Sequence, residues 1–159
     1  MTHVGSMITA RGVRPKVQYQ HKFATTYLYG SYSPVDGDSF VFEIEGVNTD
    51  IFEAYLKEFS KHRPQQGKIV VIDNAGFHST KNIEIPSNII LLRIPPYSPE
   101  LNPCEQVWAW IKKKYKNNVF NDIDQLKSWL HQTVKKMEPD LIKSIVSNHH
   151  YLNAFIPTK

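Results

Sequence analysis

The chain has 159 residues, a length that suits one domain with its own hydrophobic core. Lys and Arg outnumber Asp and Glu by 19 to 15, a mild excess that is compatible with a polyanionic partner but common in proteins without one. The single cysteine, Cys104, excludes an intramolecular disulfide and a cysteine-rich zinc site. Without a signal peptide or an apolar run near the roughly 20 residues that cross a bilayer, the protein is expected in the cytoplasm.

The first part of the chain predicts a hairpin followed by a helix. Residues 16–45 are rich in β-forming side chains, with a turn at 34–38. Residues 49–62 predict a helix, with Thr49 or Asp50 as its N-cap. Its apolar side chains recur at spacings of three and four and therefore share one face: Phe52, Tyr55, Leu56 and Phe59.

Two short apolar runs come next, at 68–72 and 89–92. Such runs predict strands buried on both faces, as central strands of an α/β sheet are. Helices are predicted to start at Asn102-Pro103, to span about 122–137, and to add a turn or two at 141–146. This order predicts one α/β domain over residues 1–159, a mixed sheet with flanking helices.

Two carboxylates stand where such a fold forms a site. Asp73 follows the strand at 68–72, at the strand end where α/β sheets bind ligands, although Asp73 and Asn74 could merely begin a turn. Glu105 lies in the first turn of a helix, where it either faces a cleft or closes a capping box with Asn102. For either residue alone, the structural interpretation is favoured, a turn at Asp73 and a capping box at Glu105. Taken together, they can hold the Mg²⁺ or Mn²⁺ pair used in phosphodiester chemistry.

The residues around these carboxylates carry a long and specific motif. Residues 71–78 read Val-Ile-Asp-Asn-Ala-Gly-Phe-His, and residues 95–108 read Pro-Pro-Tyr-Ser-Pro-Glu-Leu-Asn-Pro-Cys-Glu-Gln-Val-Trp. This sequence resembles the catalytic domain of DDE transposases, both those of the mariner-like superfamily and their bacterial insertion-sequence relatives. The resemblance is strong over 68–115 and weaker over 12–59.

The resemblance implies an RNase H-like fold in which Asp73 and Glu105 are the second and third acidic residues of a metal-binding triad. It also implies two Mg²⁺ or Mn²⁺ ions, cleavage and strand transfer of DNA at transposon ends, and DNA as the partner. The protein would form homo-oligomers, would not bind membranes, and would associate with the nucleoid if it is bacterial.

One departure from the family pattern matters. The family's first catalytic Asp lies on the first strand, upstream of the segment that matches residues 12–15, and no acidic residue precedes Asp36 here. Asp36 and Asp38 belong to the hairpin turn and come too late in the fold to replace it. We therefore expect the first strand, and the helix-turn-helix region before it, to be missing. The alternative function is an inactive transposase remnant that acts only in DNA binding or self-association.

Further residues follow from the motif and the helix pattern. The resemblance places Asn74, His78, Tyr97 and Asn102 as neighbours of the active site, although His78 could instead bond a loop carbonyl. Lys112, Lys113 and Lys114 either contact DNA phosphates or form a solvated helix face. The apolar stripe of their helix predicts that Trp108 and Ile111 are buried while Lys112 and Lys113 are exposed.

Overall fold

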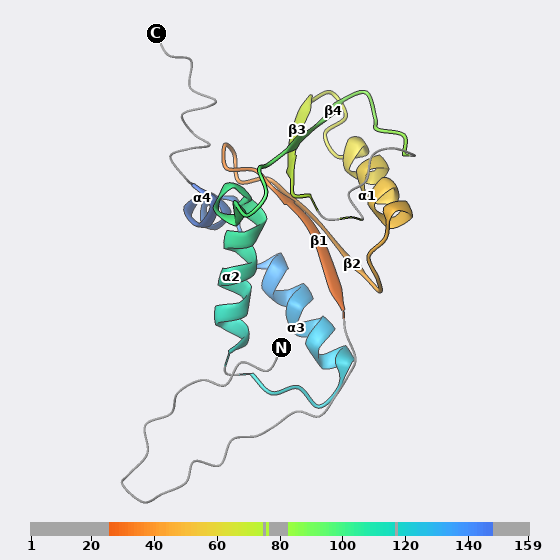
Figure 1. The fold of residues 1–159 in the computed structure, drawn as a ribbon. Coiled ribbons are helices and arrows are strands. Elements are labelled where there is room, and N and C mark those ends of the chain that lie inside the picture. The colour runs from red at the N-terminus through yellow and green to blue at the C-terminus, as the bar shows by residue number, and fades with distance from the viewer. Residues whose placement is uncertain (1–25, 75, 77–82, 117, 148–159) are drawn as a thin grey trace, which may run out of the picture.

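The structure is a computed structural model that describes residues 26–74, 76, 83–116 and 118–147. Its elements run β1 (Tyr27–Tyr32), β2 (Ser39–Ile44), α1 (Thr49–Lys61), β3 (Lys68–Ile72), β4 (Ile89–Arg93), the 3-10 turn η2 (Pro99–Leu101), α2 (Pro103–Tyr115), α3 (Ile123–Lys135) and α4 (Pro139–Val146) (Figure 1). This order confirms a mixed α/β chain, with element types as predicted. None of the described helices is long and apolar enough to cross a membrane.

The strands form two separate pairs. β1 and β2 are antiparallel, with Tyr27 opposite Ile44, and β3 and β4 are parallel, with Lys68 opposite Ile89. Across the described part of the chain, no ladder joins the two pairs. In the described residues the predicted mixed sheet is therefore seen only as these two pairs, because a single sheet requires a continuous hydrogen-bonded ladder and none runs between β1 and β3 there.

The hairpin turn falls at the predicted place. The Ser33 amide donates to the Asp38 carbonyl at 2.8 Å, and the Gly37 amide donates to the Ser33 carbonyl at 3.0 Å. Gly37 has a φ of 75°, in the left-handed region that favours glycine. The turn also touches α4, since a side chain at Gly37 would meet the Pro139 carbonyl.

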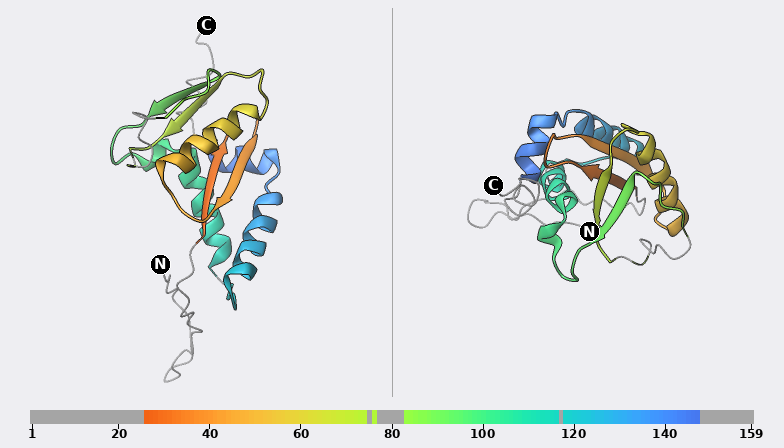
Figure 2. Two further views of the ribbon diagram at one scale, coloured as in Figure 1. Left: turned by 90° about the vertical axis from the view of Figure 1, so that its right-hand side faces the viewer. Right: turned by 90° about the horizontal axis from the view of Figure 1, so that it is seen from above.

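The β1–β2 hairpin separates two hydrophobic cores, with α2, α3 and α4 on one face and α1 on the other (Figure 2). The core against α2 contains the buried side chains Tyr32, Val107, Ile111, Leu130, Met137, Ile142 and Val146. The core against α1 contains Phe52, Tyr55, Leu56, Ile72 and Ile89. Alternate residues of the hairpin point to opposite faces, so one pair of strands contributes to both cores.

The β3–β4 pair is covered on one face only. Ile72 and Ile89 pack against α1, but the side chains on the other face are open, with Ile69 57%, Ile90 65% and Leu92 55% exposed. The expectation that these strands are buried on both faces is therefore wrong. Their continuous apolar runs reflect an outer face that no described element covers.

The helix starts agree with the capping rules but not with every predicted residue. α1 is capped by Asn48, whose side chain accepts from the Ile51 amide at 2.8 Å, and not by Thr49 or Asp50. α2 is capped by Asn102, as predicted. On α2, Ile111 is buried and Lys112 and Lys113 are exposed, as expected, whereas Trp108 is half-buried. It packs edge-on against Tyr32, with ring centroids 6.0 Å apart.

The docking of the hairpin turn on α4 makes Gly37 sensitive to substitution. Gly37→Ala would strain a left-handed backbone and place a methyl group 2.1 Å from the Pro139 carbonyl oxygen. We expect it to lower the free energy of unfolding by about 3 kcal/mol in a urea titration followed by circular dichroism.

Gly46→Ala is the matched control, because nothing lies within 4 Å of its added methyl group and its backbone is outside the left-handed region. Its effect should stay within about 0.5 kcal/mol of zero, or be slightly stabilising. Equal effects of the two substitutions would contradict the contact between the turn and α4.

Candidate active site

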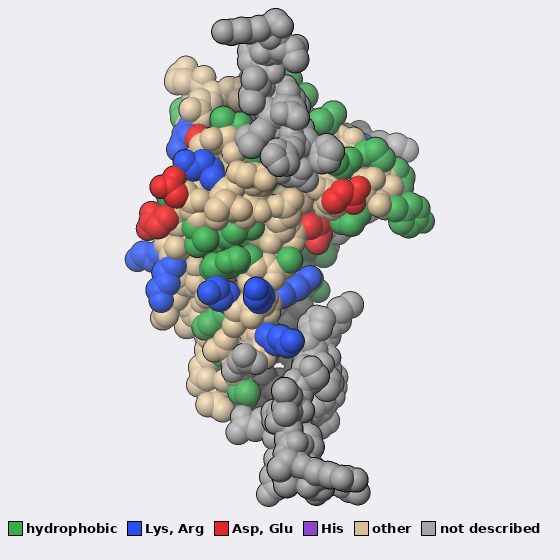
Figure 3. All heavy atoms as spheres, turned by 90° about the vertical axis from the view of Figure 1, so that its left-hand side faces the viewer, with side chains coloured by type: hydrophobic (Ala, Val, Ile, Leu, Met, Phe, Trp, Pro, Cys, Tyr) green, Lys and Arg blue, Asp and Glu red, His purple; other side chains and the backbone are tan. Residues whose placement is uncertain are grey.

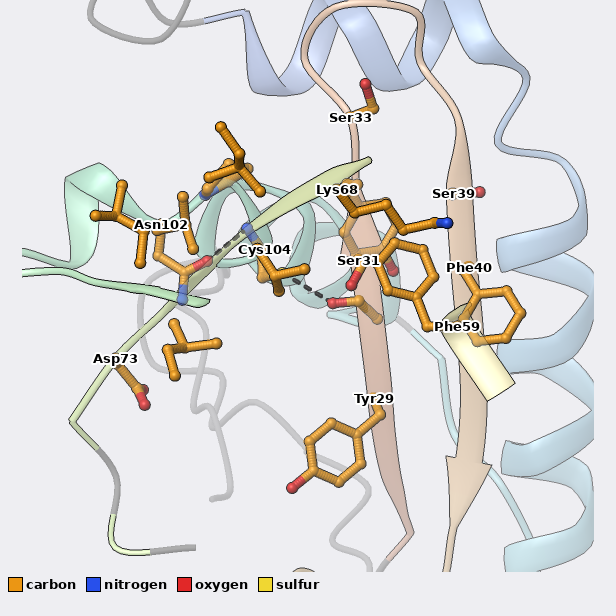
Figure 4. A pocket seen from close by; sticks show the side chains of 18 of the residues that line it. Tyr29, Ser31, Ser33, Ser39, Phe40, Phe59, Lys68, Asp73, Asn102 and Cys104 are labelled. Carbon is orange, nitrogen blue, oxygen red and sulfur yellow. Dashed lines mark hydrogen bonds between the residues drawn. The ribbon is translucent and has the colours of Figure 1, made fainter. Parts of the chain in front are cut away.

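A cavity of about 750 Å³ lies between β1, β3 and the start of α2 (Figure 4). Asp73 and Glu105 both belong to its wall, although they are 32 positions apart in the sequence. Asp73 comes from a strand end and Glu105 from a helix start, while the other two carboxylates of the wall, Asp36 and Asp38, belong to the hairpin turn.

Asp73 is positioned by the end of β3. The Ile94 amide donates to the Ile72 carbonyl at 3.0 Å, and the Arg93 guanidinium donates to the Asp73 carbonyl at 3.4 Å. The Asn74 side chain donates to the Ile94 carbonyl at 3.0 Å. These bonds tie the end of β3 to the segment that follows β4, so Asn74 links two elements and does more than shape a local turn.

Glu105 is positioned by the cap of α2. The Asn102 side chain accepts from the Cys104 amide at 3.0 Å, and the Asn102 amide donates to the Pro99 carbonyl at 3.0 Å. The Asn102 amide is therefore bonded within its own turn, so the capping-box alternative for Glu105 is not what the structure shows. The Glu105 carboxylate is exposed, and within the described residues it has no recorded hydrogen bond or ion pair.

The charges of Asp73 and Glu105 both affect the pKa of the Cys104 thiol. Its thiol donates to the Gly30 carbonyl of β1 at 3.0 Å. Burial, followed by the negative charges of Glu105 and then Asp73, raises the pKa of this thiol to about 12. On the opposite wall, burial and the charge of Asp73 raise the pKa of Tyr29 to about 12. Asp73 and Glu105 therefore act electrostatically on one thiol in one cavity.

The predicted neighbours divide between the cavity and the surface. Asn102 lines the cavity wall, while Asn74 is exposed at its edge. Tyr97 is fully exposed and does not line the cavity. The structure therefore does not support its expected place beside the site. His78 lies outside the described residues.

The basic residues lie at the other end of α2. Lys112, Lys113 and Lys114 are exposed in its last turns, and the Lys114 ammonium lies 5.2 Å from the centroid of the Trp110 ring. Figure 3 shows Lys and Arg side chains gathered across the face of the molecule that includes α2. Glu105 and Lys112 are seven positions apart, which corresponds to about 10 Å along the helix.

Sequence reasoning did not single out Tyr29 or Cys104, which both line the cavity. The alternation in β1 places Tyr29 on the same face as Ser31, but only the folded chain shows that this face meets Asp73. Cys104 sits between the cap and Glu105 in the first turn, where nothing in the sequence shows that its thiol reaches β1.

The donor set fits a divalent metal only in part. Carboxylates are the hard oxygen ligands that Mg²⁺ and Mn²⁺ prefer, and Asp73 and Glu105 supply two of them. In the ranges that the structure describes, however, no group of three or more His, Cys, Asp or Glu side chains is arranged to hold a metal ion. The residues present would hold a metal weakly.

Comparisons with known proteins identify the family of the chain. No solved structure matches the chain significantly. An uncharacterized protein of Sinorhizobium fredii, y4pE/y4sA, is 30% identical over 102 residues, which make up 63% of this chain and 76% of that protein. The sequence model of the family described as DDE superfamily endonuclease matches residues 2–127, which include the hairpin, Asp73 and Glu105. The chain therefore belongs to the DDE superfamily of endonucleases.

Proposed function

We propose that this chain is the catalytic domain of a transposase that cleaves DNA and transfers strands at transposon ends with the help of Mg²⁺ or Mn²⁺. The observation that carries the proposal is the shared cavity of Asp73 and Glu105, whose charges both act on the Cys104 thiol. Membership of the endonuclease family supports the same chemistry. The arrangement of β and α elements is compatible with an RNase H-like domain.

Asp73 and Glu105 would be the metal ligands. A bound pair of divalent ions supplies activation of the attacking oxygen and stabilisation of the leaving oxygen in phosphodiester chemistry. The chain's own contribution is positional, since bonds at Arg93 and Asn74 tie the end of β3 to the chain beyond β4. The Asn102 cap sets the first turn of α2, from which Glu105 projects.

DNA is the proposed partner, and the end of α2 supports this. Lys112 and Lys113 are exposed and have no ion-pair partner within the described residues. Basic side chains of this kind bind DNA phosphates without reading sequence. The excess of four positive charges over the whole chain favours the same partner.

A second candidate function is an inactive remnant that binds DNA or associates with other transposase chains. The observation that favours it is the number of carboxylates, because Mg²⁺ dehydrates reluctantly and requires a well-formed octahedral site. In the part of the chain that the structure describes, no group of three or more His, Cys, Asp or Glu side chains forms such a site.

Metal binding tests the assignment of the two ligands without depending on activity. We expect the chain to bind Mn²⁺ weakly, with a dissociation constant on the order of millimolar, measured by proton relaxation. Asp73→Asn and Glu105→Gln should each weaken binding several-fold, because each removes one anionic ligand.

Glu100→Gln is the matched control, since Glu100 is an exposed carboxylate in η2 that does not line the cavity. Its Mn²⁺ affinity should equal that of the unchanged protein. If all three substitutions behave alike, Asp73 and Glu105 are not the metal ligands.

DNA cleavage separates the two candidate functions. Supercoiled plasmid incubated with the chain and Mg²⁺ or Mn²⁺ should show little nicking above background, because no group of three or more metal-ligating side chains is formed within the described residues. Residual nicking should disappear in Asp73→Ala and persist in Glu100→Gln. Robust nicking that Asp73→Ala abolishes would show that the chain is catalytically competent and would exclude the remnant.

DNA affinity at increasing salt tests the basic end of α2. The double substitution Lys112→Ala, Lys113→Ala should reduce the slope of log affinity against log salt by about 2, since each phosphate contact contributes about 0.9. Lys57 and Lys61, exposed on α1, provide a matched double substitution that should change the slope by less than about 0.5. Equal slopes of log affinity against log salt for the two variants would show that α2 is not part of the DNA interface.

A further inference from the structure

The face of the β3–β4 pair that points away from α1 is an open apolar surface. Ile69 lies opposite Ile90, and Val71 lies opposite Leu92, so these four aliphatic side chains form one continuous patch across the two strands. Three of them, Ile69, Ile90 and Leu92, are each more than half exposed. A contiguous apolar patch on a protein surface usually marks a contact site.

Both strands have the sequence of strands that are covered on two faces. Val70, Ile72, Ile89 and Leu91 belong to the core against α1, and the residues between them are aliphatic as well. A strand with one face in water normally alternates apolar with polar residues, whereas a continuous apolar run is typical of a strand that is covered twice. The patch therefore lacks a cover among the described residues.

The connection between β3 and β4 does not supply this cover. Its described end lies on the opposite face, where Ile83 packs against the α1 core and the Glu84 amide donates to the Glu53 carboxylate of α1 at 3.4 Å. A single crossover between neighbouring parallel strands runs over one face of the pair. The cover has to come from another part of the chain or from a partner.

The patch faces the side of the molecule on which α4 lies. In Figure 1 and in the right-hand view of Figure 2, α1 is on one side of β3 and β4, while α2 and α4 are on the other. Residues 148–159 follow α4 in the chain. Six extended residues span about 20 Å, which is enough to pass the start of α2, since packed elements lie about 10 Å apart.

Residues 151–156 have the composition to cover the patch. They read Tyr-Leu-Asn-Ala-Phe-Ile, with five apolar residues in six and no charge. Residues 1–25 are the other long stretch outside the described part of the chain, and no six consecutive residues there contain more than three apolar ones. The C-terminal segment therefore gains more than the N-terminal one from burial against an apolar surface.

We propose that residues 151–156 bind to the outer face of β3 and β4 and cover the patch. β3 is then packed from α1 on one face and from the C-terminal segment on the other, up to the residue before Asp73. The family match ends at residue 127, so this contact involves a part of the chain beyond it. The proposal does not rest on the proposed function, because it concerns neither DNA nor a metal.

Thiol accessibility tests the contact without DNA, metal or activity. Cys104→Ser removes the native thiol, and Ile90→Cys places a reporter on the patch. Ile90 is the suitable position because, unlike the other three members of the patch, it does not line the cavity. We expect a maleimide to label this cysteine at least about tenfold more slowly than in a chain that also carries Leu152→Ser and Phe155→Ser, which should release the segment and open the patch.

Ala54→Cys is the control reporter, because Ala54 is exposed on α1, on the other side of the strand pair. Its labelling rate should be the same with and without the two serine substitutions, and circular dichroism checks that each variant is folded. Fast labelling at position 90 in both chains would show an open face. Slow labelling in both would show a different cover, and slow labelling that disappears on dilution of the protein would show a second copy. Each of these three results would overturn the proposal.

Discussion

The structure depends on one constraint, namely that the β1–β2 hairpin must be apolar on both faces. Leu28 and Tyr32 pack against the helices α2 to α4, while Tyr29 and Phe40 pack against α1. In the antiparallel register, directly opposite residues of β1 and β2 point to the same face. A slip by one residue would therefore move the side chains of one strand to the opposite core. Because the β3–β4 pair is attached through α1, and Glu105 through α2, the hairpin also determines how the two carboxylates approach each other.

Polar contacts at the ends of the hairpin hold this arrangement. His62 and Asp38 lie 2.7 Å apart, and the Arg63 guanidinium bonds Asp36 at 2.7 Å, so the turn is anchored to the end of α1. In the middle of β1, the Cys104 thiol bonds the Gly30 carbonyl. Gly30 must lack a side chain there, because an added methyl group would meet the Tyr32 ring at 2.8 Å. The bond from Cys104 holds the start of α2 against β1, where its first turn borders the cavity.

The two carboxylates reach one cavity from different elements. Asp73 follows the end of β3 and Glu105 stands in the first turn of α2, and both residues line the same wall. Groups that act together on a ligand must be held in fixed geometry. The bonds around Asn74 and Arg93 and the Asn102 cap of α2 therefore bear on how firmly the site is built, whichever of the two candidate functions holds.

The sequence by itself determined the type and order of the elements, because periodicity, capping residues and turn chemistry are local properties. It also singled out Asp73, Glu105 and the Asn102 cap, since the motif that carries them is contiguous. Only the tertiary structure decided that the described strands form two pairs, that Ile69 and Leu92 are exposed, and that Tyr97 does not line the cavity. These are properties of which edges and faces meet, and an apolar run has the same pattern whether its second face is covered or open. Pairing between segments far apart in the chain depends on the packing of the whole, which no local pattern records.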